Sequence, residues 1–590
     1  MKEIKNYWKE QVKRAVISAA ETLGIKNVTI DTDSIIIENP PNPEMGDLAF
    51  PMYQFSKILR KSPQEIASLC RDKLLSINET KGSKGEPFAA GPYLNIKMDR
   101  LYVANTVVLS IEKAEDRYGE GQLLNGRRII IEFSCPNTNK PLHLGHLRND
   151  AIGMSLSAIF KASGAVVRKV NLINDRGIHI CKSMLAYKRF AEGSTPDTEG
   201  VKGDHFVGKY YVLFNDWASK DSSAEPAARE MLKKWEQGDG EVVSLWKKMN
   251  TWAIDGIGKT YRATGVDFDK IYFESETYKL GREDVLRGLG NGVFYKEKDG
   301  SIWVDLSDYG LDKKVLLRGD GTSLYLTQDI GTAVQRYRDW PFDMLIYVVA
   351  SEQNYHFKVL FKVLKMLGYS WADNLYHLAY GMVNLPGGKM KSREGKVIDA
   401  DDLLTQLKDL AKDEIISKGR DSEVEDLCKT AESIALGALN YYLLQVSPYK
   451  DMIFFPEESI SFTGNTGPYL QYMGARISSV LRKYEEGREK YSGGAFKPEL
   501  LGGKEEWKLI KMLGNFPELV ENAAVEKNPS LIAVYLYKLA KHFSRFYHDN
   551  PILHNENKDL IKSRIVLAKS VLQVLKNGLK FISVPFLERM

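Results

Sequence analysis

The chain has 590 residues, of which 43% are hydrophobic and 27% are charged, and its net charge is +5. A chain of this length is too long to fold around a single hydrophobic core, so we expect roughly three to five domains. No run of residues approaches the ~18 apolar residues of a membrane span, and four widely spaced cysteines exclude a CxxC zinc site or a disulfide framework. A charged N-terminus excludes a secretory signal, so we expect a cytoplasmic protein with no fold-bound metal.

The positive charge is concentrated at one end of the chain. Residues 531–590 contain ten Lys/Arg and four Asp/Glu, whereas the preceding residues contain 72 basic and 73 acidic side chains. A polyanionic partner would be attracted to this end, although an ordinary solvated helix face gives the same count.

The first ~120 residues mix helical patterns with turns. Residues 62–70 have the Ser-Pro start of a capped helix, and residues 79–87 form a polar, glycine-rich stretch that predicts a loop. Three glycines within 118–127 indicate a linker to the next domain.

A strand, turn, helix and strand are predicted next. The apolar run 128–133 is typical of a strand buried in a parallel sheet, and 134–141 is a turn. A helical pattern covers 143–160, and a second strand pattern covers 166–173. This order opens a doubly wound nucleotide-binding domain.

The remaining chain predicts an insertion, a second half-sheet and a helical end. Residues 182–320 are mainly helical and polar, strand-like runs resume at 323–327 and 344–349, and residues 385–397 form a Gly/Lys-rich loop. Beyond residue 421 nearly every pattern is helical. The predicted fold class is α/β: a Rossmann-like doubly wound parallel sheet with a helical insertion, an α+β N-terminal domain and an all-α C-terminal domain.

The chemistry centres on His143-x-Gly145-His146, which opens the predicted helix after the buried strand. A helix N-terminus favours phosphate, and Gly145 lets an adenine or ribose approach the backbone. The imidazole N–H groups of His143 and His146 would stabilise charge during attack on an α-phosphorus. Lys140 and Arg148 would add positive charge. This tetrapeptide also occurs by chance, and its position after a strand favours function.

The whole segment from Glu132 to Arg148 resembles the HIGH signature of class I aminoacyl-tRNA synthetases, in the form typical of arginyl-tRNA synthetases. Other stretches resemble motifs of this family in the same order, so that the resemblance covers essentially the whole chain: 46–51, 325–329, 352–356 and 464–472. The resemblance implies a ligase of protein biosynthesis that uses ATP to form arginyl-adenylate. It then transfers arginine to the 3′-terminal ribose of tRNA(Arg), releasing AMP and pyrophosphate.

An arginine site must satisfy a planar guanidinium, which carboxylates do best. In the segments that resemble the family, we predict Asp329 as the guanidinium partner, with Tyr325 one helical turn earlier. Glu132 and Asn137 are predicted to hold the ammonium, carboxylate or guanidinium, and Gln353 matches a further pocket position. Alternatively, Tyr325 is an aromatic side chain packed in the core, and Asp329 is a carboxylate that stabilises a helix N-terminus. Such a site rejects lysine, so no editing domain is expected.

The loop 387–396 occupies the place of the family's KMSKS loop, where a basic loop closes over ATP and neutralises pyrophosphate. A solvated basic loop is the alternative. The predicted ATP-binding residues are those of the two signatures and one histidine between them: His143, Gly145, His146, His356, Lys389, Met390, Lys391, Ser392 and Arg393.

One position departs from the KMSKS pattern, because Ser392 stands where the second lysine belongs. We predict that Lys140, just before the HxGH segment, replaces this lysine, and Lys391 is the alternative. The predicted catalytic residues are therefore Lys140, His143, His146 and Lys389.

Candidate tRNA contacts lie in the C-terminal part. Residues 448–484 mix aromatic, glycine and basic residues, which suits stacking on unpaired bases, and we predict contacts by Gln471 and Tyr472. Lys538, Lys541 and Arg545 recur on one helix face. Ordinary amphipathic helices with aromatic cores would show similar patterns.

The resemblance also implies the domain organisation. We expect an N-terminal tRNA-elbow-binding domain at 1–120, a catalytic domain at 121–185 and 321–400, an insertion at 186–320, and an anticodon-binding domain at 401–590. The expected partners are arginine, tRNA(Arg) and ATP with Mg²⁺, with no membrane and a monomeric chain. Two alternatives remain: another class I synthetase or adenylyl-transferring enzyme, and a catalytically silent RNA-binding relative.

Overall fold

The computed structural model describes residues 1–590 except 78–83, 385 and 387–397, and its chain divides into two compact units. Unit 1 comprises Met1–Gly119, Arg476–Leu519 and Lys538–Asn577. Unit 2 comprises Glu120–Ala475, Val520–Tyr537 and Gly578–Met590. Every helix in the described ranges is too short or too polar to cross a membrane.

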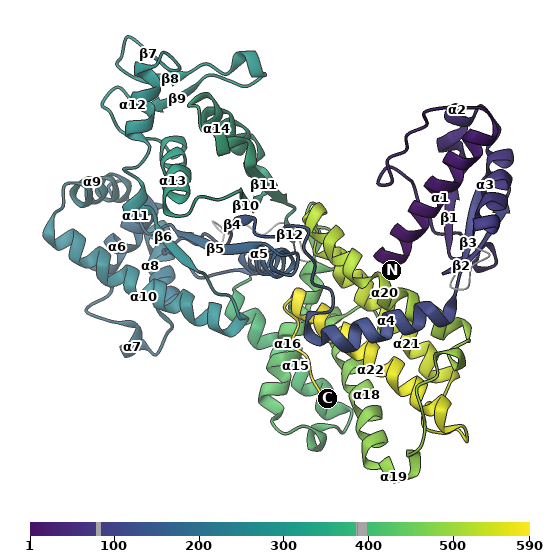
Figure 1. The fold of residues 1–590 in the computed structure, drawn as a ribbon. Coiled ribbons are helices and arrows are strands. Elements are labelled where there is room, and N and C mark those ends of the chain that lie inside the picture. Colours follow the sequence, from purple (N-terminus) through teal and green to yellow (C-terminus); the bar gives the residue numbers. More distant parts are fainter. Residues whose placement is uncertain (78–83, 385, 387–397) are drawn as a thin grey trace. The chain divides into compact units, whose positions relative to one another are not determined.

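Unit 2 is built around a five-stranded sheet in the order β11-β10-β4-β5-β6, and each neighbouring pair is parallel. Its strands are β4 (Arg128–Glu132), β5 (Val166–Ile173), β6 (Lys270–Phe273), β10 (Met344–Ala350) and β11 (Leu375–Tyr380). Helix α5 (Leu144–Ala162) packs between the sheet and two later helices, α15 (Ala400–Ser417) and α16 (Leu427–Leu444). Figure 1 shows α13 (Tyr325–Asp339) and α14 (Asn354–Met366) on the other side. The predicted α/β class is confirmed.

The central strand follows directly from its composition. Ile129, Ile130 and Ile131 are at most 1% exposed, because β4 has neighbours on both edges and helices on both faces. Strands buried on both faces read as continuous apolar runs, and such a run predicted this strand. The predicted helix 143–160 and strand 166–173 are likewise confirmed as α5 and β5.

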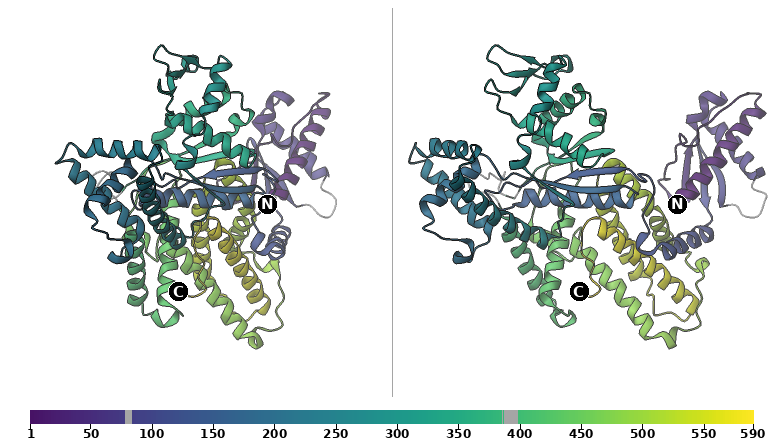
Figure 2. Two further views of the ribbon diagram at one scale, coloured as in Figure 1. Left: turned by 90° about the vertical axis from the view of Figure 1, so that its left-hand side faces the viewer. Right: turned by 60° about the vertical axis from the view of Figure 1, so that its left-hand side comes forward.

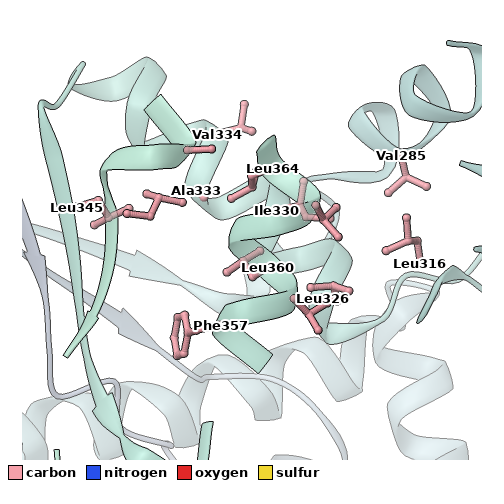
Figure 3. Close-up of a cluster of buried hydrophobic side chains, with 14 of the residues drawn as sticks. Val285, Leu316, Leu326, Ile330, Ala333, Val334, Leu345, Phe357, Leu360 and Leu364 are labelled. Atoms are coloured by element: carbon pink, nitrogen blue, oxygen red, sulfur yellow. The ribbon is translucent and has the colours of Figure 1, made fainter. Parts of the chain in front are cut away.

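The predicted strand at 323–327 is wrong, because helix α13 begins at Tyr325. Leu326, Ile330, Ala333 and Val334 are buried, and their spacing of four, seven and eight residues is that of one helix face. Figure 3 shows this face of α13 against Leu360 and Leu364 of α14. Residues 323–327 alone alternate as in a strand, but the apolar spacing over the residues that follow is helical, and this longer pattern determines the structure.

The segment predicted as a mainly helical insertion also contains strands. Strand β6 joins the central sheet, and a small antiparallel sheet consists of β7 (Tyr295–Lys296), β8 (Ile302–Val304) and β9 (Lys314–Leu317). Four helices share a separate core rich in aromatic side chains: α6 (Ile178–Phe190), α8 (Gly203–Ala218), α9 (Ala224–Glu236) and α10 (Gly240–Thr264). Figure 2 shows these helices gathered at one end of the sheet.

Unit 1 combines a small sheet with helices. Strands β1 (Leu48–Pro51), β3 (Tyr93–Met98) and β2 (Gly85–Ala90) pair antiparallel in that order, and α1 (Lys2–Thr22) packs against α3 (Pro63–Ile77). Helix α4 (Arg100–Ala114) follows the sheet. Four C-terminal helices contribute residues to both units: α18 (Gly467–Glu486), α20 (Lys504–Glu526), α21 (Ser530–Asp549) and α22 (Lys558–Phe581).

Candidate functional site

The predicted site residues follow the carboxyl ends of the two central strands. β4 and β10 pair in parallel, with Ile131 opposite Ile346. From β4 the next strands extend toward β6, whereas from β10 the next strand is β11 at the opposite edge. Open α/β sheets bind ligands at the point where the strand order reverses, just beyond the carboxyl ends.

The turn after β4 has a strained backbone held by side chains of unit 2. Ser134 and Cys135 have positive φ values of 72° and 49°. The Ser134 N–H donates to Asn149 Oδ1 (2.7 Å), its hydroxyl lies 2.7 Å from the Tyr261 hydroxyl, and the Cys135 N–H donates to Asn171 Oδ1 (3.0 Å). Each such non-glycine residue costs about 1–3 kcal/mol and persists only where its surroundings determine it. The path from β4 to α5 is therefore fixed by several elements.

The HxGH histidines cap helix α5 and hold each other in place. The Gly145 N–H donates to His143 Nδ1 and the His143 N–H donates to His146 Nδ1, both at 3.1 Å. Because each Nδ1 accepts, the proton of a neutral ring must sit on Nε2. Burial lowers the pKa of His143 to about 4 and that of His146 well below its usual value. Both rings are thus neutral Nε2–H donors at pH 7.

Gly145 lies so close to the first histidine that a side chain would displace it. A Cβ at this position would be 2.9 Å from His143 Cε1 and 3.0 Å from Nδ1. Glycine therefore leaves room for the His143 ring over the helix start.

Lys140 and Arg148 differ in what they offer an anion. Lys140 is half-buried, burial lowers its pKa, and it forms no ion pair within the described part of the chain. Arg148 is 0% exposed, and its guanidinium donates to the backbone carbonyls of Gly381, Met382 and Lys450. Arg148 consequently braces the chain beyond β11, and the expectation that it adds charge at a phosphate is wrong.

A cavity of about 450 Å³ lies beside the HxGH segment. Its wall includes Lys140 and His143 from that segment and His179, His205, Lys209 and Tyr211 from α6 and α8. Asn137, one of the predicted arginine ligands, is exposed and also lines this cavity. The cavity therefore joins the predicted nucleotide segment to the predicted insertion.

One group near this cavity has metal-ligand spacing. One ligand atom each from Asp204, His205 and Asp401 lie within 4.8 Å of one another. The Lys202 ammonium lies 3.2 Å from Asp204 Oδ2 and also pairs with Asp401. Lys202 thus offsets part of the negative charge of these carboxylates.

Glu132, a predicted arginine ligand, ends β4 and is 5% exposed. It pairs with Arg336 of α13, which is 1% exposed. Burial raises the pKa of Glu132, Arg336 lowers it, and the nearby Asp329 carboxylate raises it. Glu132 and Asp329, the two carboxylates predicted to bind arginine, therefore lie close enough to interact electrostatically.

Asp329 lies in the first turns of α13 and His356 in the first turn of α14. His356 Nε2 is 2.6 Å from Asp329 Oδ2, and the two side chains are 30% and 36% exposed. Tyr325 is 75% exposed, and Gln353 is exposed just before α14. Among the described residues, no hydrogen bond or ion pair joins Tyr325 or Gln353 to Asp329.

The predicted loop residues Lys389, Met390, Lys391, Ser392 and Arg393 lie outside the described residues. The chain that follows them is attached to the HxGH segment. The Leu144 N–H donates to the Ile398 carbonyl (3.2 Å), and the Ala400 N–H donates to the Leu142 carbonyl (3.0 Å). Residues 398–400 therefore pair with residues 142–144 at the start of α5.

The predicted tRNA contacts differ in exposure. Lys538, Lys541 and Arg545 are exposed on α21. Tyr472 is half-buried, with the Arg420 guanidinium 5.2 Å from its ring centre. Gln471 is 0% exposed, and its amide donates to the Ser433 and Pro585 carbonyls. Gln471 in this conformation holds elements of unit 2 together and is not available to a tRNA.

Two residues of the site were missed by sequence reasoning. Arg336 follows Asp329 by seven residues, two turns along the same helix face, and this signal was lost because 323–327 was interpreted as a strand. Tyr261 holds Ser134 from helix α10, more than a hundred residues along the chain, and nothing in the local sequence indicates that contact.

Three protein-family models match successive parts of the chain. Residues 108–455 match the sequence model described as "tRNA synthetases class I (R), catalytic domain". Residues 470–590 match "DALR anticodon binding domain", and residues 6–98 match "Arginyl tRNA synthetase N terminal domain".

Individual relatives agree with these matches. The chain is 56% identical over 598 residues to an arginine–tRNA ligase of Treponema denticola, with 100% of both chains covered. It is 47% identical over 590 residues to that of Borrelia hermsii, with 99% of both covered. The structure resembles Thermus thermophilus arginyl-tRNA synthetase, with a TM-score of 0.81, 25% identity, and 99% and 100% coverage. Arginyl-tRNA synthetase from Plasmodium falciparum, at 19% identity, a TM-score of 0.74 and 99% coverage of both chains, shares the fold. The chain belongs to the arginyl-tRNA synthetase family of class I aminoacyl-tRNA synthetases.

Proposed function

We propose that this chain is an arginine–tRNA ligase. It activates arginine with ATP and transfers it to the 3′-terminal ribose of tRNA(Arg). The observation that carries the proposal is the pairing of two features at the carboxyl ends of β4 and β10: two carboxylates suited to guanidinium, and a helix start capped by neutral histidines.

In the first step, an arginine carboxylate oxygen attacks the ATP α-phosphorus and pyrophosphate leaves. The Nε2–H groups of His143 and His146, at the positive end of the α5 dipole, donate to the phosphate as negative charge develops. Neutral rings suit this role because they donate without giving up a proton. Lys140 then neutralises the leaving pyrophosphate together with Lys389, while Met390, Lys391, Ser392 and Arg393 close over the nucleotide.

ATP enters as its Mg²⁺ complex. Mg²⁺ retains several waters and is held mainly by substrate phosphates in such sites. At the Asp204 group, the Lys202 ammonium already pairs with both carboxylates and competes with a metal ion for them. His356 is the further proposed nucleotide contact.

Arginine is held by its guanidinium on Asp329, with Glu132 and Asn137 at the end of β4 and Tyr325 and Gln353 at the rim. The exposure of Tyr325, Asn137 and Gln353 leaves them free to close on a ligand. Lysine has one compact charge and lacks the planar fork of donors, so it would leave carboxylate oxygens without a hydrogen bond and is rejected.

In the second step, a terminal ribose hydroxyl of tRNA(Arg) attacks the carbonyl carbon of arginyl-adenylate, and AMP leaves. The helical domain from residue 401 binds the anticodon side, with Tyr472, Lys538, Lys541 and Arg545 as proposed contacts. The domain at 1–120 binds the tRNA elbow, and 186–320 is an insertion within the catalytic domain at 121–185 and 321–400. We further propose a cytoplasmic monomer.

A charging assay tests this function. The purified chain is incubated with ATP, Mg²⁺, total tRNA and each amino acid in turn, and aminoacyl-tRNA is measured. Arginine alone should be charged. Charging with another amino acid would indicate a different class I synthetase, and tight tRNA binding without charging would indicate a silent relative.

A further inference from the structure

Glu132, which is predicted to bind substrate arginine, already pairs with an arginine of the chain itself, Arg336. Arg336 Nη2 donates to Glu132 Oε2, and both side chains are almost wholly buried. The guanidinium carbon lies 5.3 Å and 5.6 Å from the ring centres of Tyr272 and Tyr347, within the range of cation–π attraction. The two tyrosines and the pair fix the position of this guanidinium.

The bond to Arg336 uses only one carboxylate oxygen. Within the described residues, Glu132 Oε1 accepts no hydrogen bond, yet it is not among the fully enclosed polar atoms that lack a partner. This oxygen is therefore still accessible. A carboxylate held through one oxygen can accept from a second donor group through the other.

The charges at this point leave room for one more cation. Glu132 and Asp329 bring two negative charges, and Arg336 brings one positive charge. Together these three side chains are net negative, and without Arg336 the site would hold two uncompensated carboxylates.

We propose that Arg336 is a positioning residue for substrate arginine: it holds Glu132 through Oε2 and directs Oε1 to the substrate. This inference rests on the proposed function. The competing role is a purely structural pair, in which Glu132 and Arg336 stabilise β4 against α13 and do not act on the substrate.

Four variants separate the two roles: Arg336→Met, Arg336→Lys, Glu132→Gln and the double variant Glu132→Gln/Arg336→Met. The double variant replaces the ion pair by neutral groups of similar size, which often restores stability. Arg338→Met, on the exposed side of the same helix, is the matched control. Aminoacylation of tRNA(Arg) gives the KM for arginine and for ATP, and thermal unfolding gives stability.

If Arg336 positions Glu132, Arg336→Met raises the KM for arginine by about tenfold or more and changes the KM for ATP by less than about twofold. Arg336→Lys shows a smaller rise, because lysine keeps the charge without the planar fork. The double variant recovers the unfolding temperature but keeps the high arginine KM.

A normal KM for arginine in the double variant would overturn the inference and show that Glu132 and Arg336 form a purely structural ion pair. Equal rises in the KM values for arginine and ATP in Arg336→Met would also overturn it. A parent chain that charges no arginine would instead refute the proposed function, so the two failures are distinguishable.

Discussion

Asp329 carries the charge that we expect to select arginine. It is more exposed than Glu132, and its position in the first turns of α13 leaves it open to a ligand. Replacing it with alanine leaves the substrate guanidinium without its main partner, so Asp329→Ala should raise the KM for arginine by about a hundredfold. The KM for ATP should stay within about twofold. Asp255→Ala, at an exposed position of α10, is the control, and normal arginine use by Asp329→Ala would refute the assignment.

Lys140 is the second residue whose role can be decided by substitution. Its half-buried ammonium lines the cavity beside His143 and has no ion-pair partner in the described ranges, so its charge is available to phosphates. Lys140→Ala should therefore slow arginine activation at least about tenfold more than Lys391→Ala. Activation is measured by exchange of pyrophosphate into ATP. The reverse order would assign the missing lysine's role to Lys391.

At the level of elements, the sequence predicts segments whose pattern is local. β4 and α5 were predicted because an apolar run and a helical period each lie within one segment. The prediction of a strand at 323–327 is wrong because these five residues fit both the strand and the helix period. Only the apolar spacing that continues through Ile330 and Val334 identifies a helix. Arg336 and Tyr261 could not be assigned, because their partners Glu132 and Ser134 come from distant segments.

Helix α5 contains a buried acid that makes stability depend on pH. Asp150 is 2% exposed, and neither carboxylate oxygen has a hydrogen-bond partner among the described residues. Burial raises its pKa from 3.8 to about 7. A raised folded pKa means that the native state binds the proton more tightly, so the contribution of Asp150 to stability is largest below pH ~4 and is lost as pH rises to about 7. The loss is on the order of 4 kcal/mol.

Asp150→Asn should remove this dependence, because asparagine is neutral at every pH. We expect similar unfolding temperatures for the parent and the variant at pH 5, and a variant more stable by a few degrees at pH 8. Asp216→Asn, an exposed change on α8, controls for the loss of a carboxylate. Thermal unfolding at both pH values measures the effect. Parallel curves for Asp150→Asn and the parent would show that Asp150 does not titrate as described.

At the scale of the whole molecule, the uneven charge predicts how tRNA is held. Lys538, Lys541 and Arg545 are exposed on one face of α21, so a triple alanine variant should raise the KM for tRNA(Arg) and reduce its dependence on salt. The KM values for arginine and ATP should not change. The triple change Lys296→Ala, Lys298→Ala and Arg318→Ala, at exposed positions around the small sheet, is the matched control. Equal effects of both sets on the KM for tRNA would indicate unspecific electrostatic attraction.

The strand order of the central sheet also has a consequence for the growing chain. β4, β5 and β6 are synthesised first, but one edge of β4 receives its partner only when β10 appears. About seventy residues lie between Phe273 and Met344, which at roughly 5–20 residues per second is several seconds of translation. During that interval the Ile129–Ile131 edge is an open template for strand addition by other chains. The strand order thus sets a time window in which the nascent protein is exposed to aggregation.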